Sequence, residues 1–175
     1  GDVRAFRMSP ARLQQLLNEG LAHHRAGRLG EAARLYDRAR AAAPRQFDVL
    51  HLCGVLAYQQ GRIADAVDQL AQARRLNPRS AACAMRLGLA LIAAGRKADA
   101  EAHLPAAVEI QPDFFEAWDN LAFCLKTQDR LKEAVGCHAR VIALQPGHAQ
   151  GWYNYGLTLS LLGSVGDALA CHDRA

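Results

Sequence analysis

Residues 115–146, FEAWDNLAFCLKTQDRLKEAVGCHARVIALQP, decide the fold class. Trp118, Leu121, Ala122 and Leu125 recur at i, i+3, i+4 and i+7, which predicts a helix with one apolar stripe. The same spacing returns in a second segment at Leu131, Ala134, Val135, His138, Val141 and Ile142. Between the segments, Asp129 tolerates the left-handed backbone that a helix C-terminus needs. The stretch predicts a pair of helices whose apolar flanks need neighbours of the same kind.

The same pattern recurs along the chain with a period of 34 residues. Prolines that close the second helices hold one phase of the period: Pro44, Pro78, Pro112 and Pro146. Small residues hold two further phases: Gly20, Gly54, Gly88, Ala122 and Gly156, and Ala32, Ala66, Ala100, Ala134 and Ala168. Five repeats start at Leu13, Phe47, Ala81, Phe115 and Ala149, and we number the slots of each repeat from these residues. The small residues then occupy slots 8 and 20, where the two helices of a pair must approach closely.

This pattern resembles the tetratricopeptide repeat family over residues 9–175. The turn residues at slot 15 agree with it independently: Gly27, Gly61, Gly95, Asp129 and Gly163. Trp118 and Trp152 match the large residue of the family at slot 4, whereas His138 and His172 stand at slot 24, where the family prefers an aromatic residue. Val141 replaces the usual alanine at slot 27. The resemblance implies an all-α protein, an α-solenoid of stacked antiparallel helix pairs wound in a right-handed superhelix.

Local signals set the expected boundaries of the array. Residues 1–8 lack the period, and we expect them to be a disordered leader or a remnant of expression. Ser9 and Pro10 predict a helix start, because a hydroxyl caps free N–H groups and proline fits the first turn. Pro105 lies inside the second helix of repeat 3, where it removes a hydrogen bond and crowds the carbonyl of Glu101, so we expect a kink.

The last repeat stops at Ala175, which is slot 27, and is therefore expected to be truncated and cut from a longer protein. Leu159, Leu162 and Leu169 would then have no following repeat to cover them. This predicts either end-to-end self-association through the uncapped repeat or fraying beyond Asp167.

Composition excludes several classes of protein. No apolar run of about 18 residues occurs, and the N-terminus lacks a secretory signal, so we expect a cytoplasmic protein without a membrane partner. An odd number of cysteines, all in predicted helices, argues against a disulfide framework. Cys137-His138 and Cys171-His172 lie one repeat apart, too far for shared zinc ligation, so we expect no metal. No catalytic motif is present, and we expect neither enzyme activity nor a cofactor.

Functional residues are expected on the first helices, at slots 2, 6, 9 and 13, which point away from the core. In tetratricopeptide repeat proteins these helices line a concave groove that binds extended peptides. Slot 6 carries several asparagines, whose amides can both donate to and accept from a peptide backbone. This row resembles in part the asparagine ladder of O-linked N-acetylglucosamine transferases, although Leu52 and Arg86 interrupt it. The predicted partner-binding residues are Asn18, Arg86, Glu116, Asn120, Phe123, Lys126, Asn154 and Leu157, with most weight on repeats 4 and 5.

The leading hypothesis is a protein-protein interaction scaffold that binds an extended peptide or partner segment in this groove. The alternative is a substrate-recruiting region of a larger bacterial enzyme, of glycosyltransferase or sulfotransferase type, whose catalytic domain lies beyond this chain. A nucleic-acid partner is not expected, because the net charge of +4 is mild and the charges along the groove roughly cancel. The carboxylate clamp of chaperone co-factors also does not fit, since its places lack the required bases.

Overall fold

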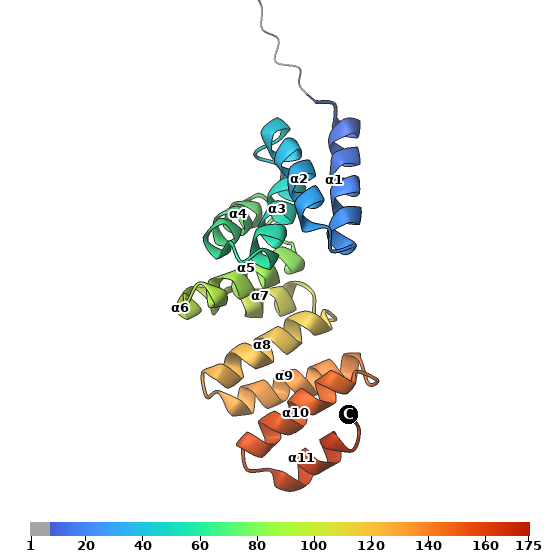
Figure 1. Cartoon of the computed structure of the whole chain (residues 1–175). Helices are drawn as coiled ribbons and strands as arrows, with labels where there is room; N and C mark the ends of the chain where they lie inside the picture. Colours follow the sequence, from blue (N-terminus) through green and yellow to red (C-terminus); the bar gives the residue numbers. More distant parts are fainter. Residues whose placement is uncertain (1–7) are drawn as a thin grey trace, which may run out of the picture. The chain divides into compact units, whose positions relative to one another are not determined.

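The computed structural model describes residues 8–175, which fall into two compact units, residues 8–97 and residues 98–175. Each unit is built of helices, and the described residues contain no strand (Figure 1). The prediction of an all-α array of helix pairs is therefore confirmed. The predicted leader over residues 1–8 lies, except for Met8, outside the described residues.

The first unit contains two complete helix pairs and one further helix. They are α1 Pro10–Arg25 with α2 Leu29–Ala42, α3 Phe47–Gln59 with α4 Ile63–Leu76, and α5 Ala81–Ala93. The Ser9 side chain caps α1 as expected, because its hydroxyl accepts a hydrogen bond of 3.2 Å from the Arg12 N–H. Buried residues from α1, α2 and α3 form one core: Leu17, Ala32, Tyr36, Ala39, Val49, Cys53 and Leu56.

The second unit follows α6 Lys97–Ala100, a short helix at the boundary. Its helices are α7 His103–Ile110, α8 Phe115–Thr127, α9 Leu131–Leu144, α10 Ala149–Leu161 and α11 Val165–His172. The tryptophans at slot 4 fix α8 and α10 to the preceding loops, because their indole N–H groups donate to the carbonyls of Pro112 (2.9 Å) and Pro146 (2.8 Å). No helix in residues 8–175 is long and apolar enough to cross a membrane.

The turn residue at slot 15 adopts left-handed backbone in every repeat. Asp129 has a φ of 61°, and the four glycines at this slot have φ between 74° and 87°. The chain then closes α8 with a hydrogen bond from the Arg130 N–H to the Leu125 carbonyl at 3.0 Å. This is the bond that ends a helix in a Schellman motif, so the role predicted for Asp129 is confirmed.

The small residues at slot 8 lie against the large residue at slot 24 of the same repeat. A Cβ atom on Gly20 would lie 2.5 Å from Cε1 of Tyr36, and one on Gly54 would lie 2.6 Å from Cγ of Leu70. The alanines at slot 20 in these repeats are buried as well. The predicted close approach of paired helices at these slots is therefore confirmed in repeats 1 and 2.

The second helix of repeat 3 is interrupted as its proline predicts. It ends at Ala100 as α6 and resumes at His103 as α7, with Glu101 and Ala102 in a turn between them. Pro105 lies in the first turn of α7, where its missing N–H leaves no intrahelical bond unmade. The expected kink is thus a complete break one turn before the proline.

Candidate functional site

The outward faces of α8 and α10 carry most of the predicted binding residues. Slots 2, 6, 9 and 13 on these two helices hold Glu116, Asn120, Phe123 and Thr127, and Gln150, Asn154, Leu157 and Leu161. We call this surface the α8–α10 face. The opposite sides of both helices are buried, at Ala117, Leu121, Gly151 and Leu159 among others.

Two large apolar side chains of the α8–α10 face are open to solvent. Phe123 is 52% exposed and Leu157 is 37% exposed. Both occupy slot 9, where repeats 1 to 3 place half-buried residues. Lys126 Nζ lies 5.7 Å from the centre of the Phe123 ring, within the range of a cation–π contact. Exposed apolar area beside polar groups is a common property of protein interaction surfaces.

The two asparagines are half-buried and already make hydrogen bonds. The Asn120 amide donates to the Glu116 carbonyl at 2.7 Å. The Asn154 amide donates to Asp119 Oδ1 at 3.4 Å, and its oxygen accepts from Gln150 at 3.0 Å. The Asn154–Asp119 bond links α10 to α8, so these amides are held in fixed orientations. An amide has two donor hydrogens and two acceptor lone pairs, and within the described residues Asn154 uses one of each.

A buried histidine lies under this face. His138 of α9 is 1% exposed, and its Nδ1 atom lies 3.8 Å from Asp119 Oδ1. Burial lowers the pKa of His138 to about 4, against a smaller opposing influence of the Asp119 charge. The histidine is therefore neutral near pH 7 and does not compensate the negative charge of Asp119.

Tyr153 and Gln150 also belong to the α8–α10 face, although they are not among the predicted residues. Tyr153 is 49% exposed and packs its ring 5.7 Å from that of His172. Gln150 orients Asn154. Tyr153 stands at slot 5, beside the outward slots and not among them, and an aromatic residue in that place was the available signal.

The remaining predicted residues, Asn18 and Arg86, belong to the first unit. Asn18 is exposed on α1, where its side-chain oxygen accepts a hydrogen bond of 3.0 Å from Gln14. Arg86 is half-buried on α5. Burial and, to a lesser degree, the Arg86 charge lower the pKa of His51, so the two side chains lie near each other.

The cysteines are buried thiols, as the sequence predicted. Burial raises the pKa of Cys53, Cys83 and Cys137 to about 11, which leaves them protonated and weakly nucleophilic near pH 7. In residues 8–175 no group of three histidine, cysteine, aspartate or glutamate side chains is placed to hold a metal ion.

Helix pairs of fixed length, a left-handed turn residue at slot 15 and close packing at slots 8 and 24 define a helical repeat protein. The tetratricopeptide repeat family matches residues 3–47 and 54–113. The chain belongs to this family. No curated protein matches the sequence.

Solved structures with the same fold include YrrB and MamA. YrrB, described as a TPR protein with an unusual peptide-binding site, is 24% identical with a TM-score of 0.73, over 91% of this chain and 82% of YrrB. One MamA structure is 21% identical with a TM-score of 0.79, over 89% of this chain and 91% of MamA. Another is 20% identical with a TM-score of 0.79, over 93% and 88% respectively. At these identities the likeness concerns the fold, including repeats 4 and 5, which the family match does not reach.

Proposed function

We propose that this chain is a protein-protein interaction scaffold and that the α8–α10 face binds an extended segment of a partner protein. The observation that carries the proposal is the combination of exposed Phe123 and Leu157 with the oriented amides of Asn120 and Asn154. Apolar contact supplies affinity, while amides that both donate and accept suit a peptide backbone in any sequence.

The spacing of the two helices favours an extended ligand. Neighbouring helices lie about 8–10 Å apart, which equals roughly three residues of extended chain at about 3.3 Å each. A peptide crossing α8 and α10 would therefore meet one amide and one apolar side chain from each helix. Glu116 and Asp119 are acidic and Lys126 is basic, so we expect a ligand with a basic residue near the former pair and no strong net charge.

Asn18 and Arg86 would take part within the first unit in the same way. Asn18 holds slot 6 of α1 and Arg86 holds slot 6 of α5. YrrB, which has the same fold, is described as having an unusual peptide-binding site, and this supports the proposal by analogy of fold.

A double substitution, Asn120→Ala with Asn154→Ala, tests the proposal. A partner is first captured from a lysate and its binding segment is mapped to a peptide. Each lost hydrogen bond costs about 0.5–1.5 kcal/mol, so we expect at least about a tenfold loss of peptide affinity by calorimetry. The melting temperature should fall only slightly, because neither side chain belongs to the core and the variant loses one hydrogen bond between helices, from Asn154 to Asp119.

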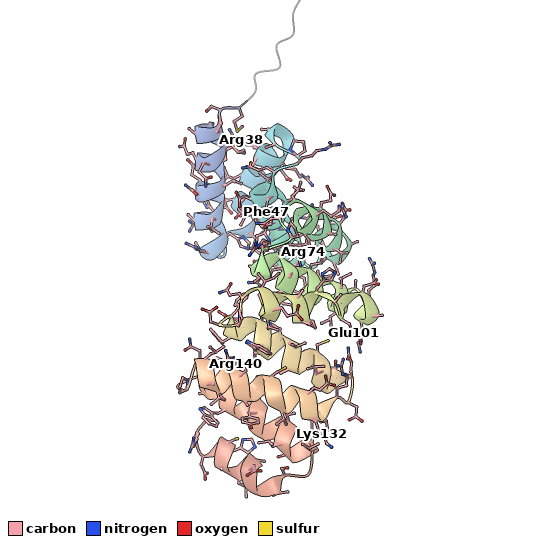
Figure 2. The ribbon with its side chains drawn as sticks, turned by 180° about the vertical axis from the view of Figure 1, so that it is seen from behind. Arg38, Phe47, Arg74, Glu101, Lys132 and Arg140 are labelled. Atoms are coloured by element: carbon pink, nitrogen blue, oxygen red, sulfur yellow. The ribbon has the colours of Figure 1, made fainter. Side chains whose placement is uncertain are left out.

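A matched control is Lys132→Ala with Arg140→Ala on α9, because both side chains are exposed and neither belongs to the α8–α10 face (Figure 2). This control should bind the peptide as the unchanged protein does. Unchanged affinity of the asparagine variant, together with loss of binding in the α9 control, would place the site on the second helices and refute the proposal.

A further inference from the structure

A cavity of about 480 Å³ opens between α7, α8 and α9 of the second unit. Residues of α7 and α9, the second helices of repeats 3 and 4, form part of its walls, and none of the predicted partner-binding residues lines it. Leu104, Leu121 and Leu125 form an apolar floor, and the Trp118 ring and Gly136 border it. Its volume is within the range of about 300–1,000 Å³ that is typical of ligand pockets.

The same place between repeats 1 and 2 holds a cavity of only about 20 Å³. The slots that line the two cavities are largely shared, so side-chain size explains the difference. At slot 24 the first unit has the buried ring of Tyr36, where the second has Leu104. At slot 23 it has the long side chain of Gln69, where the second has Cys137.

Two further changes widen the cavity in the second unit. Slot 22 of repeat 4 is Gly136, and a Cβ atom added there would meet nothing within 4 Å. Slot 25 of repeat 3 is Pro105, and the helix break before it takes Glu101 and Ala102 out of the helix. The greater volume therefore follows from the residues of repeats 3 and 4, since repeats 1 and 2 have the same architecture and leave only about 20 Å³.

Charged groups lie at the rim of the cavity and not inside it. Arg130 donates two hydrogen bonds of 2.8 and 2.7 Å to Glu133, and the two side chains neutralise each other's charge. Glu101, in the turn between α6 and α7, is exposed and makes no hydrogen bond or ion pair within residues 8–175 (Figure 2). The corresponding slot of repeat 1 is Ala33. The charge of Glu101 also acts on Arg130, whose pKa is raised by Glu133 and, to a lesser degree, by Glu101. With two carboxylates and one guanidinium, the rim carries a net charge of −1 beside an apolar floor.

We infer that this cavity is a second protein-binding site, which takes one bulky apolar side chain of a partner polypeptide next to a lysine or arginine. An apolar anchor filling a pocket is the usual centre of an interface, and the carboxylate of Glu101 selects the neighbouring base. The polar side chain of Gln128 in the lining is already engaged, because it donates to Cys124 Sγ at 3.5 Å and accepts from Arg130 at 3.4 Å. The charged groups lie at the rim, where a chain that runs across the mouth would meet them. The thiol of Cys137, whose pKa burial raises to about 11, is a neutral apolar part of the wall.

The two tryptophans supply a reporter and its control. Trp118 lines the cavity and Trp152 holds the same slot one repeat later without lining it. The full chain is labelled with 5-fluorotryptophan, and the two fluorine signals are assigned with Trp152→Phe. The probes are the capped tripeptides Lys-Phe-Lys, Glu-Phe-Glu and Lys-Ala-Lys.

We expect Lys-Phe-Lys to shift the Trp118 signal saturably, leaving Trp152 in place, and Lys-Ala-Lys to shift neither. Glu-Phe-Glu should bind about three- to fivefold more weakly, which is the strength of an exposed charge pair, and Glu101→Gln should remove that difference. Gly136→Leu should abolish the Trp118 response by filling the cavity, while Ala139→Leu, exposed on the same helix, should preserve it. Cys137→Gln, which restores the residue type of slot 23 in repeat 2, is a second filling variant.

Equal shifts of both tryptophans, or a Trp118 response that survives both filling variants, would overturn the inference. The double asparagine variant of the α8–α10 face should leave the Trp118 response unchanged. If the double asparagine variant still bound its partner, that result would therefore contradict only the proposed function of the α8–α10 face and not the inference about the cavity.

Discussion

Gly20→Ala tests the close packing of paired helices most directly. A Cβ atom on Gly20 would lie 2.5 Å from Cε1 and 2.8 Å from Cδ1 of Tyr36. The Tyr36 ring is 1% exposed, and its hydroxyl lies 3.4 Å from His24 Nδ1, so the ring has little room to retreat. Overpacking of a core costs about 1–3 kcal/mol. Alanine regains about 0.8–1 kcal/mol in helix propensity over glycine, and we expect a net loss of up to about 2 kcal/mol.

Gly30→Ala on α2 is the matched control. Gly30 is exposed and has nothing within 4 Å of an added Cβ atom, so alanine there should be neutral or stabilise by up to about 1 kcal/mol. The propensity gains largely cancel between the variants. Their difference in the free energy of unfolding, measured by urea denaturation and circular dichroism, should therefore equal the overpacking cost of about 1–3 kcal/mol.

The same substitution in a Tyr36→Ala protein tests whether the Tyr36 ring causes the loss of stability. In a Tyr36→Ala protein the ring is gone, and Gly20→Ala should become neutral or stabilising. Equal stabilities of the Gly20 and Gly30 variants would refute the packing argument. So would a Gly20→Ala cost that persists without the Tyr36 ring.

Four further predictions follow from single features. Asp129→Gly should stabilise the protein by up to about 1 kcal/mol in thermal denaturation, because left-handed backbone is strained for other residues, and a valine there should destabilise it. The pKa of His138 is about 4 in the folded protein against an ordinary 6.5. The neutral buried ring therefore contributes fully to the free energy of unfolding above pH 6.5, and this contribution should decline by at most about 3 kcal/mol as the pH falls to 4. His138→Phe should lack this part of the pH dependence. Gly88→Leu should lower the melting temperature through a cost of about 1–3 kcal/mol or more, if Gly88 packs as Gly20 does. Leu159 is buried against Ala168 and Cys171, so the prediction that it stays uncovered is wrong, whereas Leu162 and Leu169 are 36% and 61% exposed. We therefore expect chains to pair end to end through Leu162 and Leu169, or α11 to fray beyond Asp167, and light scattering that shows a monomer together with strong amide-exchange protection of α11 would contradict both.

The helix pairs could be predicted from sequence because their determinants are local. Four first helices begin at the predicted first slot, Phe47, Ala81, Phe115 and Ala149, since apolar spacing and the preceding proline act within a few residues. The left-handed turn at Asp129 and the break before Pro105 depend on backbone sterics alone. Such effects are encoded by the residue and its neighbours.

The state of the candidate site depends on contacts between helices that no spacing rule contains. The outward slots predicted that Phe123 and Leu157 point away from the core, and both are exposed. The hydrogen bond that joins Asn154 to Asp119, however, links residues 35 positions apart. His138 was recognised as a departure from the family, whereas its neutral, buried state arises from α9 packing beneath α8. Tyr153 is exposed although its slot does not point outward.

The period, most helix limits and the turns can be predicted from the residues alone, because a residue of fixed size or backbone preference recurs every 34 positions. Where free space remains depends on how the helices pack against one another. The cavities of about 480 and 20 Å³ occupy equivalent places in the two units, and they differ through several side chains brought together from separate helices. The volume of the cavity depends on all of these side chains together. In the sequence Gly136 is an ordinary helix glycine, and its place beside the cavity follows only from the packing of Leu104, Pro105 and Cys137 around it.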